Sequence, residues 1–306
     1  MTTTAAIAKH TDCEQNSTAV GARAGVRATL RLEFAGDAAT NHTRLTASLQ
    51  EPPLRVVRAF AIENGTALAH LHNVSGGLLG GDHLTLNVTA AANSRAQITT
   101  TGATRVYRTR EDAAATHVVN KIDVGDNALL EWVPDAVIPF AGARFVQRTM
   151  IHLAEGAGIF WWEVLAPGRE ARGEIFEYAS VELRTDILAL GRPIIVERAR
   201  LEPKRSELSS VARLGSYRTW ATFYICRVGL APSAWLDLEQ EVREVSMPFA
   251  APGETLWGIS TVAAHGLMVR CLARQGRNVL PGLQAIWNAA KLLLYGESAA
   301  PPRKVN

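Results

Sequence analysis

Alternation of apolar and polar residues dominates the chain from Val26 to about residue 228. Segments such as 27–34, 84–88 and 145–153 place apolar side chains at every second position, as a strand with one buried face requires. The same period recurs at 68–71, 97–101, 121–124, 129–133 and 181–185. Many short strands separated by turn residues predict a mainly β fold.

A weak internal repeat runs through this β region. A strand, a turn, a small residue and an apolar strand follow one another at 88–98, 124–130 and 153–159. The small residues are 32 and 29 residues apart: Ala96, Ala128 and Ala157. Repeats of this length predict a stacked, solenoid-like or layered β-assembly, in which each unit covers the apolar face of its neighbour.

The period changes to that of a helix near the C-terminus. A first apolar stripe predicts a helix over 233–245 and consists of Trp235, Leu238, Val242 and Val245. A second stripe predicts a helix over 279–295 and consists of Leu280, Leu283, Trp287, Ala290 and Leu294. We therefore expect a β-assembly with two α-helices near the C-terminus.

Composition narrows the function classes. The 32 basic and 29 acidic residues give a net charge of +3 and form no Lys/Arg stripe, which argues against a nucleic-acid partner. Apolar runs such as 158–162 are too short to span a membrane, and the N-terminus lacks the apolar core of a signal peptide. The cysteines, Cys13, Cys226 and Cys271, have no disulfide or zinc spacing. These features predict a cytoplasmic protein.

The first 24 residues differ in composition from the rest of the chain. They are rich in Thr, Ala, Ser and Asn and show no apolar periodicity. Such a segment cannot bury enough apolar surface to order itself. We expect residues 1–24 to form a disordered tail and residues 25–306 to form a single β-rich domain.

The segment 75–83 carries two glycine pairs followed by a carboxylate: Gly76-Gly77, Gly80-Gly81 and Asp82. It is neither a phosphate loop nor a dinucleotide fingerprint, because those motifs open a helix and here a strand pattern follows. For the glycines we favour a double turn that shapes the backbone of a β-scaffold. The role of Asp82 stays open.

Three carboxylates lie in apolar or aromatic surroundings: Glu131 before Trp132, Glu163 after Trp161-Trp162, and Glu197 within 193–198. A buried carboxylate is unfavourable unless it is paired, hydrogen-bonded or coordinating. Alternatively, Glu131 or Glu197 faces water, or Glu197 pairs with a nearby arginine. If several of them line an interior passage, they form a row of oxygen ligands suited to cation transit rather than capture.

The glycine segment and four later motifs together resemble the urease accessory protein D family, also called UreH. After Gly76-Gly77-x-x-Gly80-Gly81-Asp82 the matching segments are 100–108, 130–135, 162–169 and 173–176. These ordered motifs carry a resemblance that extends over the chain from Val26 to Trp287. The chain departs from the family pattern at Arg105, at Pro167 and at its end, 302–306, where the family usually has an aromatic residue.

This resemblance implies a large β-assembly with two C-terminal helices, acting as a non-enzymatic chaperone in urease maturation. The implied partners are apo-urease and the urease accessory proteins F and G, of which G is a GTPase. The implied cargo is nickel(II), bound only transiently, with no permanent cofactor. Positions that match the family's passage are Asp82, Thr104, Glu163 and Glu197. The candidate docking surface for the partner accessory protein is the stripe Leu280, Leu283, Trp287 and Leu294, part of which must also pack on the β-body.

Two other functions stay open on the residues alone. A β-solenoid or sandwich hydrolase would use Asp82 and Glu163 as paired carboxylates. A purely structural adaptor would carry the acids only as surface residues and would bind no divalent ion above background.

Overall fold

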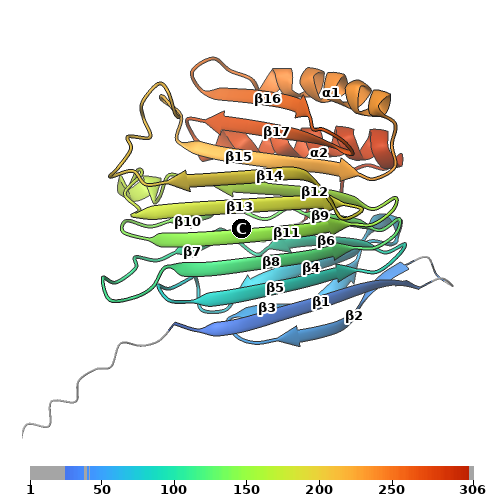
Figure 1. The fold of residues 1–306 in the computed structure, drawn as a ribbon, viewed down its shortest axis with the longest axis horizontal. Helices are drawn as coiled ribbons and strands as arrows, with labels where there is room; N and C mark the ends of the chain where they lie inside the picture. Colours follow the sequence, from blue (N-terminus) through green and yellow to red (C-terminus); the bar gives the residue numbers. More distant parts are fainter. Residues whose placement is uncertain (1–24, 38–39, 41, 303–306) are drawn as a thin grey trace, which may run out of the picture.

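The computed structural model describes residues 25–37, 40 and 42–302, whose strands form two large sheets (Figure 1). Sheet A has seven strands, in the order β14 (Arg192–Leu201), β13 (Ser180–Ala189), β11 (Arg144–Leu153), β8 (Thr116–Val124), β5 (His83–Ala90), β1 (Arg27–Asp37) and β2 (His42–Gln50). The predicted mainly β fold is confirmed.

Sheet B has ten strands. Eight follow one another in the order β16 (Thr255–Thr261), β17 (Gly266–Ala273), β15 (Thr219–Arg227), β12 (Gly158–Leu165), β9 (Leu129–Trp132), β6 (Arg95–Thr100), β4 (Ala67–Asn73) and β3 (Leu54–Ala61). Two short strands complete it, β10 (Val137–Pro139) beside β12 and β7 (Thr104–Val106) beside β10. These short strands lie at one end of the space between the sheets.

The chain passes from sheet A to sheet B and back as it advances, so that like strands stack in parallel. In sheet A the parallel series is β1, β5, β8, β11 and β13. In sheet B it is β4, β6, β9 and β12. The stacked, solenoid-like assembly predicted from the repeat is confirmed.

The register of these strands corrects one detail of the repeat. The Leu129 N–H donates to the Ser94 carbonyl, and the Gly158 N–H donates to the Ala128 carbonyl. Because Gly158 follows Ala157, the stacked small residues are Ser94, Ala128 and Ala157, all of them buried. The prediction of Ala96 was therefore wrong by two residues.

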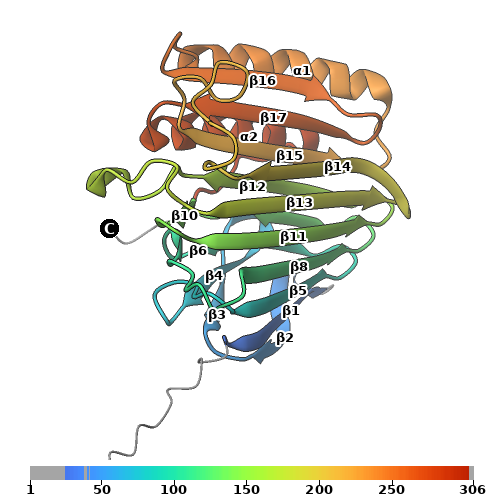
Figure 2. The ribbon, with the colours of Figure 1, turned by 60° about the vertical axis from the view of Figure 1, so that its left-hand side comes forward.

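The molecule has three layers: sheet A, sheet B and a helical layer on the far face of sheet B (Figures 1 and 2). Alternate residues of β12 show the division. Ile159 and Trp161 belong to the core between the sheets. Phe160 and Trp162 belong to a second core that sheet B shares with the helices. The central strands of sheet B are therefore buried on both faces.

The helical layer consists of α1 (Pro232–Ser246) and α2 (Val279–Tyr295), which confirms the two predicted C-terminal helices. Proline stands at the start of α1, where its missing N–H removes no helical hydrogen bond. Gly296 ends α2 in the left-handed conformation, with its N–H bonded to the Leu292 carbonyl. Within the described ranges, no helix is both long and apolar enough to cross a membrane.

The predicted N-terminal tail lies outside the described residues, as does Cys13. The division of the chain into a tail and a single domain therefore stays a prediction. Cys226 and Cys271 are buried as free thiols, and burial raises the pKa of each to about 12.

Candidate functional site

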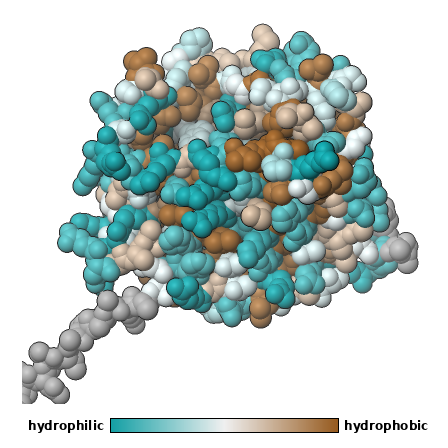
Figure 3. Space-filling model, viewed as in Figure 1, coloured by the Kyte–Doolittle hydropathy of each residue, from teal (hydrophilic) through white to brown (hydrophobic). Residues whose placement is uncertain are grey.

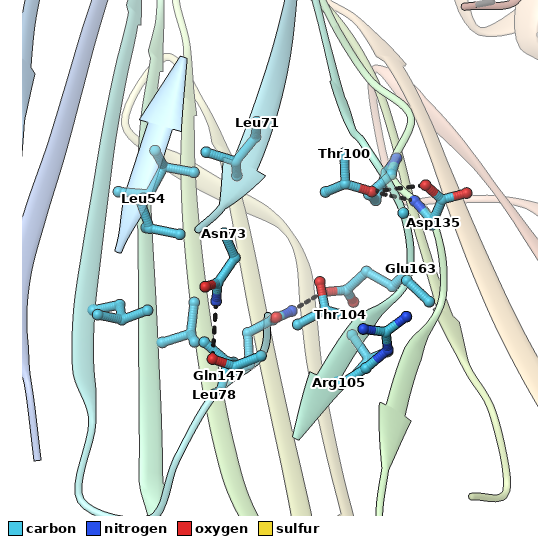
Figure 4. A pocket seen from close by; sticks show the side chains of 18 of the residues that line it. Leu54, Leu71, Asn73, Leu78, Thr100, Thr104, Arg105, Asp135, Gln147 and Glu163 are labelled. Atoms are coloured by element: carbon cyan, nitrogen blue, oxygen red, sulfur yellow. Dashed lines mark hydrogen bonds between the residues drawn. The ribbon is translucent and has the colours of Figure 1, made fainter. Parts of the chain in front are cut away.

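A cavity of about 320 Å³ lies between the two sheets (Figure 4). Apolar side chains of both sheets line much of it, including Leu84, Phe145 and Trp161. The polar part of the lining includes Gln147 from β11 and Glu163 from β12, which reach toward one another from opposite sheets. A space of this kind can hold a small polar ligand or a hydrated ion.

A second, smaller cavity of about 20 Å³ adjoins the first. The two cavities share part of their lining: Val137, Gln147, Glu163 and Val164. The second cavity continues to Thr185, Glu197 and Tyr224. Glu163 therefore stands where a wide space narrows toward Glu197.

The carboxylate of Glu163 is held by neutral donors. The Gln147 side-chain amide donates to one oxygen, and the Thr185 hydroxyl donates to the other at 3.3 Å. No salt bridge to Glu163 forms within the described part of the chain. Burial, and secondly the negative charge of Glu197, raise the pKa of Glu163 to about 7. At neutral pH this group can exchange a proton for a cation.

Glu197 points into the same space from the edge strand β14 of sheet A. The Tyr224 hydroxyl donates to one of its oxygens at 2.9 Å. The Arg270 guanidinium donates to the other at 3.2 Å. The alternative in which Glu197 pairs with an arginine is thus correct, but the partner comes from β17 of sheet B. The sequence neighbour, Arg198, pairs with Asp186 instead.

Glu131 lies on the opposite face of sheet B from Glu163. It is fully buried and accepts hydrogen bonds from Lys291 Nζ and Trp287 Nε1, each at 2.7 Å. Burial raises the pKa of Glu131, whereas the Lys291 ammonium acts in the opposite direction. The alternative in which Glu131 faces water is wrong, because this side of β9 is covered by α2.

The structure separates Asp82 from the other predicted passage residues. Asp82 is buried, and its carboxylate accepts the backbone N–H groups of Val26 at 2.9 Å and Leu79 at 2.8 Å. It lies outside the linings of both cavities. The Asp82–Glu163 pair that a hydrolase would need is not formed.

The glycines of segment 75–83 allow the tight turns next to Asp82. Gly81 has a φ of +89°, which favours glycine. A Cβ on Gly77 would lie 2.4 Å from a ring carbon of Tyr107. Gly76 and Gly77 also line the large cavity, so the double turn forms part of its wall. This geometry agrees with the structural interpretation of the glycines.

Thr104 also lines the large cavity, on the short strand β7. Figure 4 places it near Glu163, with Arg105 close by. The structure therefore brings together Thr104, Glu163 and Glu197 along one space. Within the described residues, no group of three or more His, Cys, Asp and Glu side chains is placed to hold a metal ion. The site offers oxygen ligands in succession rather than a closed metal centre.

The predicted docking stripe on α2 needs correction. Leu283, Trp287 and Leu294 are 1%, 0% and 8% exposed and pack against sheet B. These three residues stabilise the fold and have no free surface for a partner. Leu280 is 41% exposed and stays available.

Sequence reasoning missed four polar side chains that surround the carboxylates: Gln147, Thr185, Tyr224 and Arg270. Each belongs to a different strand, and nothing local marks Thr185, Tyr224 or Arg270 as a neighbour of these carboxylates. Only one signal was present. Gln147, Thr149 and Ile151 alternate with exposed Arg148 and Met150, so Gln147 shares the face that Phe145 buries.

The comparison with known proteins gives a consistent result over nearly the whole chain. A family model described as "UreD urease accessory protein" matches residues 26–306. The protein "Urease accessory protein UreD" of Herpetosiphon aurantiacus is 46% identical over 263 residues, which is 86% of this chain and 91% of that protein. The protein of the same name from Cupriavidus necator is 30% identical over 280 residues, covering 90% and 93% of the two chains.

Proposed function

The chain belongs to the UreD family of urease accessory proteins, and from this premise we propose that it conducts nickel(II) to apo-urease through the two adjoining cavities. Its role is that of a chaperone in urease maturation and not that of a catalyst. One observation carries the proposal: Glu163 stands where the cavities meet and is held, among the described residues, by neutral hydrogen-bond donors.

The sizes of the two cavities support a stepwise passage. The large cavity, about 320 Å³, has room for an ion with coordinated water. The second, about 20 Å³, has room for about one water molecule. An ion that moves from the first to the second must exchange water for protein oxygens, and Glu163 and Glu197 supply them. Because the pKa of Glu163 is raised to about 7, an incoming cation displaces a proton there.

The proposed partners are apo-urease and the urease accessory proteins F and G, of which G is a GTPase. We further propose that this exchange takes place in the cytoplasm, a reducing compartment. The unpaired thiols of Cys226 and Cys271 agree with that environment.

Reconstitution of urease tests the proposal. We expect Glu163→Gln, alone and with Glu197→Gln, to leave the chain folded and bound to apo-urease and the other accessory proteins. The nickel content and activity of the matured urease should fall about tenfold or more, because the ion loses its charged ligand at the narrowing.

The matched control is Glu182→Gln, which removes the same charge from the outer face of sheet A, where Glu182 pairs with Arg184. It should mature urease normally. Full nickel loading by the double variant would contradict the passage and favour a purely structural adaptor.

A further inference from the structure

Sheet B extends past the edge of sheet A. Sheet A ends at β14, whereas sheet B continues through β15, β17 and β16 (Figures 1 and 2). The inward face of these last strands is therefore covered by sheet A only in part. Glu197, the last carboxylate of the proposed passage, lies on β14 at this boundary. The side chain of Glu197 is 15% exposed, so solvent reaches its carboxylate at this boundary.

Arg270 from β17 covers Glu197 at this boundary. Its guanidinium contacts Glu197 at 3.2 Å, and its side chain is 53% exposed, compared with 15% for Glu197. Tyr224 donates to the second carboxylate oxygen. Both oxygens of Glu197 are thus occupied, and a positive charge stands between that carboxylate and solvent. A divalent ion can neither pass nor coordinate Glu197 fully until Arg270 moves.

Arg270 is the exposed member of its ion pair with Glu197. Water can therefore solvate the guanidinium when it leaves that carboxylate. A carboxylate supplied by another protein can therefore compete with Glu197 for the guanidinium. Glu131 offers the contrast, since its cation, Lys291, is only 3% exposed and lies on the side of α2 that packs on sheet B.

The surface around Arg270 has the composition of a protein interface. One row across the three strands is apolar, because Trp220 pairs with Leu272 and Leu272 with Leu256. Leu256 is 53% exposed, while Trp220 and Leu272 are half-buried. Arg274 and Arg270 lie on either side of this row. An aromatic and aliphatic centre with flanking arginines is typical of a docking surface for an acidic protein segment.

We propose that Arg270 closes the passage at Glu197, and that a partner protein docks on the β15–β17–β16 face and opens it by drawing Arg270 to a carboxylate of its own. This inference rests on the proposed function. Coupling of opening to docking has a physical advantage, because the ion is then exposed only where a receiving or delivering protein covers the opening. The outer face of sheet A is largely hydrophilic in Figure 3.

The closing role is tested on the purified full chain with Ni²⁺ alone. Arg270→Gln should take up Ni²⁺ about tenfold faster than the unaltered chain, because the repelling charge is gone. Arg270→Lys should stay within about twofold of it, because the charge remains. Arg148→Gln, a matched change on the outer face of sheet A, should have no effect. An unchanged rate in Arg270→Gln would overturn the closing role.

The docking role is tested without nickel, by assembly of the full chain with apo-urease and the accessory proteins F and G. Trp220→Ala, Leu256→Ser and Arg270→Glu should each weaken assembly at least about tenfold. Arg148→Glu should not. Assembly that tolerates all three changes would overturn the docking surface. Because no ion is present, that result is separate from a failure of nickel transfer through Glu163.

Discussion

Glu131 and Glu163 lie on neighbouring strands of one sheet, and their environments differ completely. Glu131 faces the helices, is sealed from water and is neutralised by Lys291 at 2.7 Å. Glu163 faces the space between the sheets, borders two cavities and accepts hydrogen bonds from an amide and a hydroxyl. Burial alone therefore does not mark a functional carboxylate. Glu163 is distinguished by a carboxylate that no cationic side chain of the described residues neutralises, beside a space that an ion can enter.

The largest effect is expected when the cation beside Glu131 is removed. Lys291→Met leaves a carboxylate buried without a partner and should lower the free energy of unfolding by about 3–5 kcal/mol. Chemical denaturation monitored by tryptophan fluorescence measures this. Adding Glu131→Leu to Lys291→Met should restore most of the loss, because no charge then remains buried. A loss below about 1 kcal/mol in the single variant would contradict the structural role of this pair.

Glu163→Gln should raise the free energy of unfolding instead of lowering it, by an amount that depends on pH. The pKa of Glu163 is about 7 in the folded chain, above its ordinary value of 4.5. Protonation of Glu163 therefore stabilises the folded chain, and this contribution is complete below pH 4.5. That contribution is lost as pH rises through 7. The variant should match the unaltered chain near pH 4 and exceed its stability by up to about 3 kcal/mol above pH 8. Denaturation curves across this range with no divergence would show that Glu163 is not desolvated.

A smaller effect is expected at Asp82, a third buried carboxylate with a different function. In Asp82→Asn only one side-chain oxygen remains to accept from the backbone N–H groups of Val26 and Leu79. One of the two hydrogen bonds is therefore weakened. Stability should fall by about 1–2 kcal/mol. Thermal unfolding measures the change, and nickel uptake should be unaltered, because Asp82 does not line the cavities. Lost uptake in a folded variant would return Asp82 to the passage.

The fold was predictable where one strand face meets water. Sheet A strands such as β1 and β5 alternate because one side is core and the other solvent. The prediction found only the start of β12, at 159, and missed β15; both strands read as continuous apolar runs because sheet B is buried on both faces. It also missed β2, whose residues are mostly exposed or half-buried. Helix α2 was found from its stripe, but that same stripe is core, so its use as a docking surface was mostly wrong.

The site was predictable only in its carboxylates. Glu163 and Glu197 stood out because acids are unusual in apolar strands. Their partners could not be found, because Gln147, Thr185 and Arg270 come from strands that meet only through long-range sheet packing. Glu131 and Glu163 point in opposite directions because of the phase of each strand, that is, which of its alternate residues face which side of the sheet. Both sides of this sheet are buried. Hydropathy cannot fix that phase, because both faces are apolar.

The most direct measurement is the position of nickel itself. Crystals of the full chain soaked in Ni²⁺ at about pH 8, where Glu163 is ionised, can be recorded at the nickel absorption edge. We expect an anomalous peak at the carboxylate of Glu163, between the two cavities, and none at Glu131. A peak confined to the outer surface, with the space around Glu163 lacking nickel at full soak, would contradict it.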